Sequence, residues 1–394
     1  MSISPRVSFA LRFAAMPILI GLVILMEAKC FFPFFRVLTF IFVFLLLADL
    51  ASLLRGKMRD VSLTLASLAF GVSLVEAAAN VLEPKELVIS TYGWSVRRPV
   101  LGWGPEHAGR FHSKKTDPKT GTTIYNVDYT IDSNLLRQTQ SCEAGPTIVF
   151  FGCSFTFGEG LNDTDTLPQS FANSLDRKER VLNMGFSGYG PQHFLRELQF
   201  GLFDTVIGSE PKLFIFMTAA WHAERTACKP YWMRYAPRYV LEKGQTVFKG
   251  DCYEGVRLQL REWLENSASY RLFIAPLLNK VSRDDVEFYI RIVLEAVRLA
   301  KQKYGVETLI PYLRQLPPNY LDGTGFDNDS IMKRLRDGGA IVMDISLTKN
   351  EAVDDAFTIH GDHHPTALAN RLRASLLRDY VERHMSGVLR LPPK

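Results

Sequence analysis

The sequence predicts a mixed α/β fold in which helices cover both faces of a mostly parallel sheet, with transmembrane helices preceding it. Two observations carry this prediction. From residue 147 onward, short apolar runs typical of buried strands alternate with segments of helical spacing, and such alternation implies a parallel sheet. Before residue 83, the chain is far more apolar and contains three stretches close to the length that a bilayer requires.

The three apolar stretches are residues 13–26, 37–54 and 61–82, and residues 1–82 are expected to form the transmembrane region. The first stretch is short for a span unless the helix extends beyond it. The third is long enough but carries Glu76, a carboxylate that needs a partner inside a membrane.

Positive charges flank these stretches unequally. Arg6 and Arg12 precede the first stretch, and Arg55, Lys57 and Arg59 separate the second from the third. Because positive residues favour the cytoplasmic side, three spans would put the following domain on the opposite side, which in a bacterium is the periplasm or the exterior. Two spans with a cytoplasmic domain, or a cleaved signal peptide in place of the first span, are the alternatives.

The remainder of the chain has ordinary globular composition and is long enough for one large domain. Residues 83–145 are rich in Gly, Pro, Tyr and charge, and predict an irregular, β-containing lead-in that helps to roof a site. Residues 146–394 form the main domain, with an insertion at about 219–282 that either shapes a substrate pocket or has no role in one.

The elements of the main domain follow in order. The first strand ends in a glycine turn, the second helix has a proline in its first turn, and the long third helix has one apolar face. Strands are expected at 147–152, 180–184, 212–217, 306–313 and 340–345, and helices at 166–175, 191–203, 283–303 and 365–385.

Composition excludes several classes of protein. The net charge of +5 is spread along the chain and no RNA- or DNA-binding motif is present, so we expect no nucleic-acid partner. Five cysteines include no Cys-x-x-Cys pair, which argues against a zinc or thioredoxin-type site. Cys228 and Cys252 would bridge in an oxidising compartment, and two reduced thiols are equally compatible with the sequence.

Two short strings hold the residue types of a nucleophilic centre. The string 150–160 puts Ser154 on a glycine-bounded turn after a strand, and the string 362–365 supplies Asp and His. A serine hydroxyl becomes a useful nucleophile when an imidazole takes its proton and a carboxylate orients the imidazole. Cys153 is an alternative nucleophile, and a serine that only caps the following turn is the structural alternative.

These strings resemble those of the SGNH, or GDSL-like, hydrolase superfamily, over about residues 147–385. The resemblance implies a flavodoxin-like three-layer α/β/α sandwich. It also implies Ser154 as nucleophile, His364 as general base and Asp362 as the carboxylate that orients it. The first block departs from the family pattern because Cys153 replaces the usual Asp.

The second and third blocks concern the oxyanion hole. The stretch 183–190 resembles the second block, which implies that the N–H of Gly188 binds the oxyanion together with the N–H of Ser154. The third block, at 218–225, lacks the family's Asn. His222 could donate a hydrogen bond in its place, or it could be an ordinary structural histidine.

The last block also departs from the strict Asp-x-x-His spacing, because Gly361 stands three residues before His364. Asp362, two residues before it, is the family-like alternative. His363 and His360 are alternative bases. The cluster could instead bind a metal ion, but no other ligand group of suitable spacing supports this, and we expect no metal and no cofactor.

The resemblance therefore implies a serine-dependent hydrolase acting on ester-linked acyl groups of a cell-envelope lipid or polysaccharide. From the apolar stretches and the charges that flank them, we expect the protein to be held in a bacterial inner membrane, with the catalytic domain in the periplasm or outside the cell. An O-acyltransferase on the same scaffold is one alternative. A catalytically degenerate binding module is the other, and the missing third-block Asn is its main support.

Overall fold

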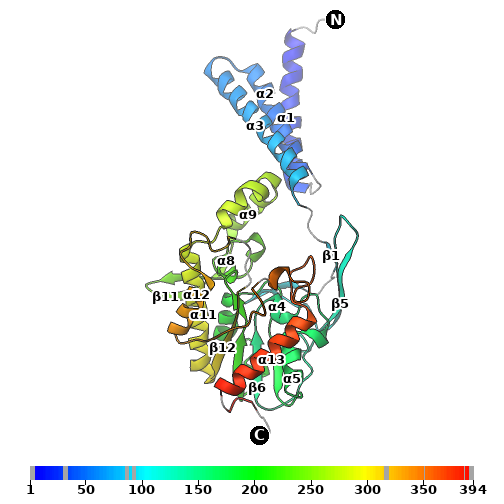
Figure 1. Cartoon of the computed structure of the whole chain (residues 1–394). Coiled ribbons are helices and arrows are strands. Elements are labelled where there is room, and N and C mark those ends of the chain that lie inside the picture. The colour runs from blue at the N-terminus through cyan, green and yellow to red at the C-terminus, as the bar shows by residue number, and fades with distance from the viewer. Residues whose placement is uncertain are drawn as a thin grey trace. The chain divides into compact units, whose positions relative to one another are not determined.

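The computed structural model of the chain describes residues 5–29, 34–84, 88–90, 95–314, 319–349, 351–385 and 387–389. The chain forms two compact units (Figure 1). One comprises Met1–Pro84 with Val256–Leu278, and the other comprises Lys85–Gly255 with Asn279–Lys394. The expected insertion at 219–282 therefore contributes residues to both units.

The first unit contains the three long helices expected from the apolar stretches: α1 (Pro5–Lys29), α2 (Phe35–Leu53) and α3 (Lys57–Leu82). Each is long and apolar enough to cross a membrane. Most of the large apolar side chains of α1 and α3 are exposed. Such exposure is unfavourable for a helical bundle in water and favourable for one surrounded by lipid.

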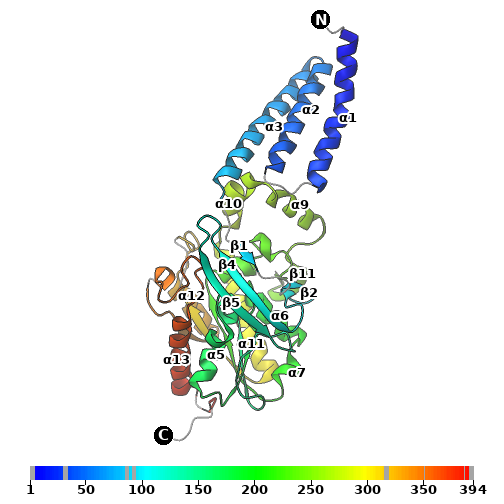
Figure 2. The ribbon, with the colours of Figure 1, turned by 90° about the vertical axis from the view of Figure 1, so that its right-hand side faces the viewer.

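The first unit also contains a short helical segment from the expected insertion. It consists of α9 (Gly255–Glu265), a π-helical turn (Tyr270–Ile274) and α10 (Ala275–Asn279). Figure 2 shows α9 and α10 at the end of the bundle where α1 ends and α2 begins.

The second unit is built on a parallel sheet with the strand order β13-β12-β8-β6-β7. Numbered by their order along the chain, these five strands stand in the order 5-4-3-1-2, which is the flavodoxin-like arrangement. This confirms the predicted fold class. The strands are β6 (Thr147–Phe151), β7 (Arg180–Asn183), β8 (Pro211–Phe216), β12 (Glu307–Leu313) and β13 (Ile341–Asp344), and the short β9 (Thr218–Ala219) pairs with β12.

Helices cover both faces of this sheet because its strands are apolar on both faces. In β6, Ile148 and Phe150 pack into one core and Val149 and Phe151 into the other, as the alternation of side chains along a strand requires. One face carries α5 (Leu167–Ser174) and α13 (Ala367–His384), and the other carries α6 (Pro191–Phe200), α11 (Arg283–Tyr304) and α12 (Asn328–Asp337). Of these helices, α12 was not expected from the sequence.

The lead-in folds as two small antiparallel sheets. One contains β1 (Val88–Ser90), β4 (Gly109–Thr116) and β5 (Thr123–Ile131) in the order β1-β4-β5, and the other pairs β2 (Val96–Arg98) with β3 (Gly102–Gly104). Alternate residues of β5 are buried, and together with Phe111 they form a core with Phe157, Phe186 and Tyr189. The lead-in therefore packs directly on the loops that follow β6 and β7.

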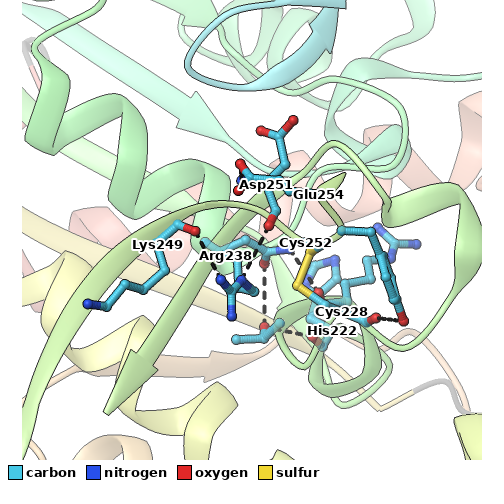
Figure 3. Close-up of a disulfide and its surroundings, with 11 residues drawn as sticks. His222, Cys228, Arg238, Lys249, Asp251, Cys252 and Glu254 are labelled. Carbon is cyan, nitrogen blue, oxygen red and sulfur yellow. Dashed lines mark hydrogen bonds between the residues drawn. A yellow bond between two sulfur atoms is a disulfide. The ribbon is translucent and has the colours of Figure 1, made fainter. Parts of the chain in front are cut away.

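The part of the expected insertion that belongs to the second unit contains α8 (His222–Thr226) and a hairpin of β10 (Pro237–Glu242) and β11 (Gln245–Asp251). A disulfide joins Cys228, just after α8, to Cys252, just after β11, with a Cα–Cα distance of 5.5 Å (Figure 3). The short elements that remain are α4 (Ser154–Phe157), α7 (Asp204–Ile207) and 3-10 turns at Asp163–Asp165, Tyr231–Met233 and Glu351–Val353.

Candidate active site

Ser154 stands at the carboxyl end of the central strand β6, as the first residue of the four-residue helix α4. The turn between strand and helix requires glycine at position 152. Gly152 has a φ of +155°, and a Cβ there would lie 2.2 Å from the hydroxyl of Thr156. This tight turn directs Ser154 toward the sheet edge where ligands of parallel α/β folds bind.

His364 and Asp362 lie in the loop that precedes α13. The loop is closed by a bridge between Thr358 and Pro365 and by a hydrogen bond from the Ile359 N–H to the His364 carbonyl. The structure brings both side chains to Ser154, although 210 residues separate His364 from it in the sequence.

The three side chains form a continuous hydrogen-bond chain. His364 Nε2 lies 2.8 Å from Ser154 Oγ, and His364 Nδ1 lies 2.5 Å from Asp362 Oδ2. Nε2 and Nδ1 are on opposite sides of the imidazole ring, so one ring can accept the serine proton and donate to the carboxylate. The order of contacts is that of a Ser-His-Asp triad.

Lys115 on β4 contacts the other oxygen of the Asp362 carboxylate, Oδ1. The Asp362 side chain is fully buried, and both of its oxygens are thus engaged by a positive or a proton-donating group. Burial alone would raise the pKa of Asp362, but the hydrogen bonds and charges of His364 and Lys115 outweigh it and lower the pKa to about 2. Asp362 is therefore ionised at neutral pH.

Glu159 adds a second carboxylate on the Ser154 side of the imidazole. Its Oε2 lies 3.9 Å from His364 Nε2 and accepts a hydrogen bond of 2.6 Å from the hydroxyl of Ser187. Burial opposes charge on the His364 ring, but the Glu159 and Asp362 carboxylates outweigh burial and raise the pKa of His364 above 6.5.

Gly188 lies in the loop after β7, with a φ of +82°. A Cβ at this position would lie 3.0 Å from both the Trp103 and the Trp232 rings, so the position requires glycine for conformation and for space. Trp103 also fixes this loop by donating from Nε1 to the Ser187 carbonyl at 2.8 Å. The neighbouring Ser187 links the loop to Glu159 and hence to the serine side of the site.

His222, which the sequence analysis considered as an oxyanion donor, lies in the protein core. It is fully buried, its Nδ1 shares a hydrogen bond of 2.8 Å with Thr218 Oγ1, and no contact among the described residues joins it to Ser154, Gly188 or His364. Burial, with the charge of Arg225, lowers the pKa of His222 well below 6.5, so the ring is neutral. The structure thus gives His222 the surroundings of a core histidine.

Trp221, rather than His222, is the third-block side chain that packs against a residue of the serine turn. Its ring centroid lies 5.3 Å from that of Phe155, and the Phe155 ring lies 5.3 Å from the His364 imidazole. The third block therefore contributes an aromatic ring that packs on Phe155, which itself lies beside the imidazole. No Asn occupies that stretch of the sequence.

The alternative site residues lie outside the hydrogen-bond chain. His360 is exposed and pairs with Asp355 at 2.9 Å, and His363 is exposed with a φ of +67°. Cys153 is buried and unbridged. In the part of the chain that the structure describes, no three His, Cys, Asp or Glu side chains lie close enough together to hold a metal ion.

Sequence reasoning missed Lys115 and Glu159. Glu159 follows the nucleophile by five residues, so its place beside the serine turn was a usable signal. Lys115 has no such signal in the sequence, because it is one of several basic residues in the lead-in. Its ion pair with Asp362 forms only because β4 packs against the loop that holds Asp362.

No protein-family model matches the chain, and no curated protein sequence matches it. Solved structures similar to it include a lipolytic protein of the G-D-S-L family from Veillonella parvula, with 14% identity and a TM-score of 0.35, over 61% of this chain and 100% of that one. The psychrotrophic esterase EstA from Pseudoalteromonas is 14% identical with a TM-score of 0.36, and the match covers 62% of this chain and 100% of that one. A carbohydrate acetylesterase family member from Sinorhizobium meliloti is also 14% identical with a TM-score of 0.36, and the match covers 63% of this chain and 100% of that one. These similarities concern the fold, and each activity is that of the protein compared.

Proposed function

We propose that the protein is a serine-dependent enzyme of the SGNH type that cleaves acyl esters. The observation that carries the proposal is the hydrogen-bond chain from Ser154 through His364 to Asp362, with distances of 2.8 and 2.5 Å. A buried, ionised carboxylate next to an imidazole that contacts a serine hydroxyl is typical of nucleophilic catalysis and is not required for binding alone.

In this mechanism His364 Nε2 takes the proton of the Ser154 hydroxyl as Oγ attacks the ester carbonyl carbon. Asp362 holds the ring in the tautomer with the proton on Nδ1 and stabilises the imidazolium that forms. His364 then gives the proton to the leaving alkoxide, which departs as an alcohol and leaves an acyl-enzyme. His364 Nε2 then takes one proton from a water molecule as the water oxygen attacks the acyl carbon, and it passes that proton to Ser154 Oγ as the carboxylic acid leaves.

The developing oxyanion is bound by the N–H groups of Ser154 and Gly188. Two features support this assignment. Ser154 begins α4, so its N–H belongs to the unpaired first turn of that helix, and the Gly188 loop is held rigid by Trp103. His222 is left out of the oxyanion hole because it is fully buried and engaged by Thr218.

The N-terminal part of the chain supports the proposed substrate class. Three apolar helices of membrane-spanning length precede the catalytic unit, so an acyl ester of a cell-envelope lipid or polysaccharide is the substrate expected to be near it. Transfer of the acyl group to a sugar hydroxyl in place of water uses the same residues, and the assay below distinguishes the two outcomes by the acyl product.

The proposal includes an outward-facing catalytic unit in a bacterial inner membrane. The positive residues between the second and third apolar stretches favour the cytoplasmic side for that loop. The Cys228–Cys252 disulfide agrees with an oxidising compartment, since cytosolic thiols are kept reduced.

The direct test is labelling of the full chain in nanodiscs with a fluorophosphonate probe, followed by turnover of p-nitrophenyl acetate. Ser154→Ala should abolish both labelling and turnover without changing the circular dichroism spectrum, because it removes one oxygen. Cys153→Ala is the matched control at the adjacent position and should retain both. With a sugar acceptor added, acyl-sugar formation would indicate a transferase, and free acid alone would indicate a hydrolase.

Labelling that persists in Ser154→Ala, or that is lost in Cys153→Ala alone, would refute the assignment of the nucleophile. A folded wild-type protein that takes no label would leave a binding module as the better description of this unit.

A further inference from the structure

The segment of residues 256–278, which is grouped with the three long helices, presents apolar side chains to its surroundings. On α9, Val256, Leu260 and Trp263 follow at spacings of four and three residues and are 78%, 56% and 48% exposed. The helical stretch that follows adds a second exposed group, Phe273, Ile274, Leu277 and Leu278.

This segment is bound to the ends of the three helices by buried polar contacts. The carboxylate of Glu76 on α3 accepts hydrogen bonds from the N–H groups of Ala268 and Ser269, at 2.7 and 3.0 Å, and from the hydroxyls of Ser267 and Ser269. Glu76 is only 1% exposed. It therefore caps the start of the helical stretch 268–279, and the partner that a carboxylate in an apolar helix requires is this segment.

A second attachment joins α9 to the junction of α1 and α2. Arg36 pairs with Glu27 at 2.5 Å, donates to the Trp263 carbonyl at 2.7 Å and lies over the Trp263 ring at 4.7 Å. The indole N–H of Trp263 donates to Glu27 at 3.0 Å. A third contact pairs Arg271 with Glu83, just beyond α3, at 2.6 Å.

These attachments fix the depth of the segment relative to a bilayer. The 26 residues of α3 span about 39 Å, whereas the hydrocarbon core is about 30 Å thick. The excess of about 9 Å corresponds to six residues, so with the start of α3 at one boundary of the hydrocarbon core, Glu76, six residues before Leu82, lies near the other boundary. Residues 267–269 reach this carboxylate directly and must lie at the same boundary.

We propose that residues 256–278 form an interfacial element whose apolar side chains insert among the lipids of the leaflet next to the ends of α1 and α3. Trp263 has the place expected of an interfacial tryptophan, with its N–H on a polar partner and its ring at the apolar boundary. The occupant of this face is the boundary region of the bilayer. The inference rests on the proposal that the three helices cross a membrane and is independent of the ester chemistry.

The test is the reaction of introduced cysteines with a water-soluble maleimide in the full chain, reconstituted in phosphatidylcholine and phosphatidylglycerol nanodiscs, with Cys30 and Cys142 replaced by Ser and Cys153 by Ala. Leu277→Cys and Val256→Cys report on the segment, at positions 76% and 78% exposed. Val353→Cys, 79% exposed in the other unit, is the water-accessible control, and Leu68→Cys, 60% exposed on α3, is the lipid-covered control.

Leu277→Cys and Val256→Cys should react at least about tenfold more slowly than Val353→Cys, as Leu68→Cys should, because lipid covers all three. Fast reaction at both segment positions, with Leu68→Cys protected, would overturn the interfacial insertion alone. Fast reaction of Leu68→Cys would overturn the membrane-spanning proposal as well. Labelling of Ser154 by fluorophosphonate is read separately in each variant, so failure of the esterase proposal does not alter these outcomes.

Discussion

Lys115 and Asp362 form an ion pair across 247 residues of sequence, and the pair supports the imidazole of His364 from behind. The lysine belongs to the lead-in and the aspartate to the loop before α13, so the lead-in completes the candidate site rather than only covering it. A carboxylate with no exposed surface is costly without such partners, and Lys115 and His364 together satisfy both of its oxygens.

Substitution of Lys115 by Met should lower kcat for p-nitrophenyl acetate by roughly tenfold, or ~1.4 kcal/mol in activation free energy. The buried Asp362 carboxylate would lose one partner and hold the imidazole less firmly. The positive charge of Lys115 also lowers the pKa of His364, so its removal should move the acid limb of the pH–rate profile to higher pH. Lys115→Arg, which keeps the positive charge, should leave the acid limb at the pH of the wild-type protein. A limb at the same pH in Lys115→Met would show that the lysine acts only through folding.

The activity of the wild-type protein should fall as the pH decreases through the pKa of His364. A general base must be neutral to accept the serine proton, and the neighbouring carboxylates raise this pKa above 6.5. The acid limb of kcat/KM should therefore have a midpoint above 6.5. A midpoint clearly below that value would contradict the electrostatics of the site.

Glu159→Gln should move the same limb to lower pH. The change removes a negative charge 3.9 Å from His364 Nε2 but leaves an amide oxygen that can accept the Ser187 hydroxyl. Glu143→Gln, in the same unit but outside the site, is the control and should leave the profile in place. An unmoved limb in Glu159→Gln would mean that Glu159 does not act on the imidazole.

Gly188→Ala should lower both turnover and stability. The position has a positive φ, which costs an alanine about 1–2 kcal/mol, and the new Cβ would press on Trp103 and Trp232. Displacement of the loop should reduce kcat by up to about 10²-fold. Gly305→Ala is the control, because its φ is also positive, at +71°, and its Cβ would meet no atom within 4 Å. Thermal unfolding and turnover of both variants separate strain from crowding, and equal activity losses would refute the role of the loop.

Removal of the disulfide should destabilise the catalytic unit by about 3 kcal/mol, since Cys228 and Cys252 close a loop with a sequence separation of 24. The double variant Cys228→Ser with Cys252→Ser should therefore unfold at lower denaturant concentration, with fluorophosphonate labelling retained below the transition. Cys142→Ser, which removes an unbridged thiol, should leave the transition unchanged. A double variant as stable as the wild type would show that the thiols are reduced in the protein.

Local patterns predicted much of the fold. The buried runs of β6, β8 and β12 and the long face of α11 are patterns of consecutive residues, and the observed elements begin and end within a few residues of the expected ones. The helix α12 was missed because its ten residues have a mostly polar surface and follow a turn-rich stretch. The β10–β11 hairpin was missed because its burial is partial and it is held by contacts with distant residues, among them the disulfide and the hydrogen bond from Tyr239 to Gln199 on α6.

The residues of the site that could be predicted are those that lie in short, recognisable sequence strings. Ser154 and Asp362-x-His364 lie in short strings of recognisable type, and the structure brings them together. His222 was considered as an oxyanion donor because it lies in the third block, where the family's Asn is missing, but position along the chain does not give the direction of a side chain. The ring lies in the core, where its Nδ1 shares a hydrogen bond with Thr218, and it is Trp221 that packs on Phe155.

The sequence by itself determined the class of fold, the three apolar helices and the candidate nucleophile with its Asp and His, because each follows from the order of residues within one segment. Only the tertiary structure decided which groups surround them. Lys115 meets Asp362, Glu159 meets Ser187, and Glu76 meets Ser267 through packing between segments that are far apart or on different elements. A buried charge is stable only where a partner is brought to it in space, and no pattern of neighbouring residues specifies which distant side chain that partner will be.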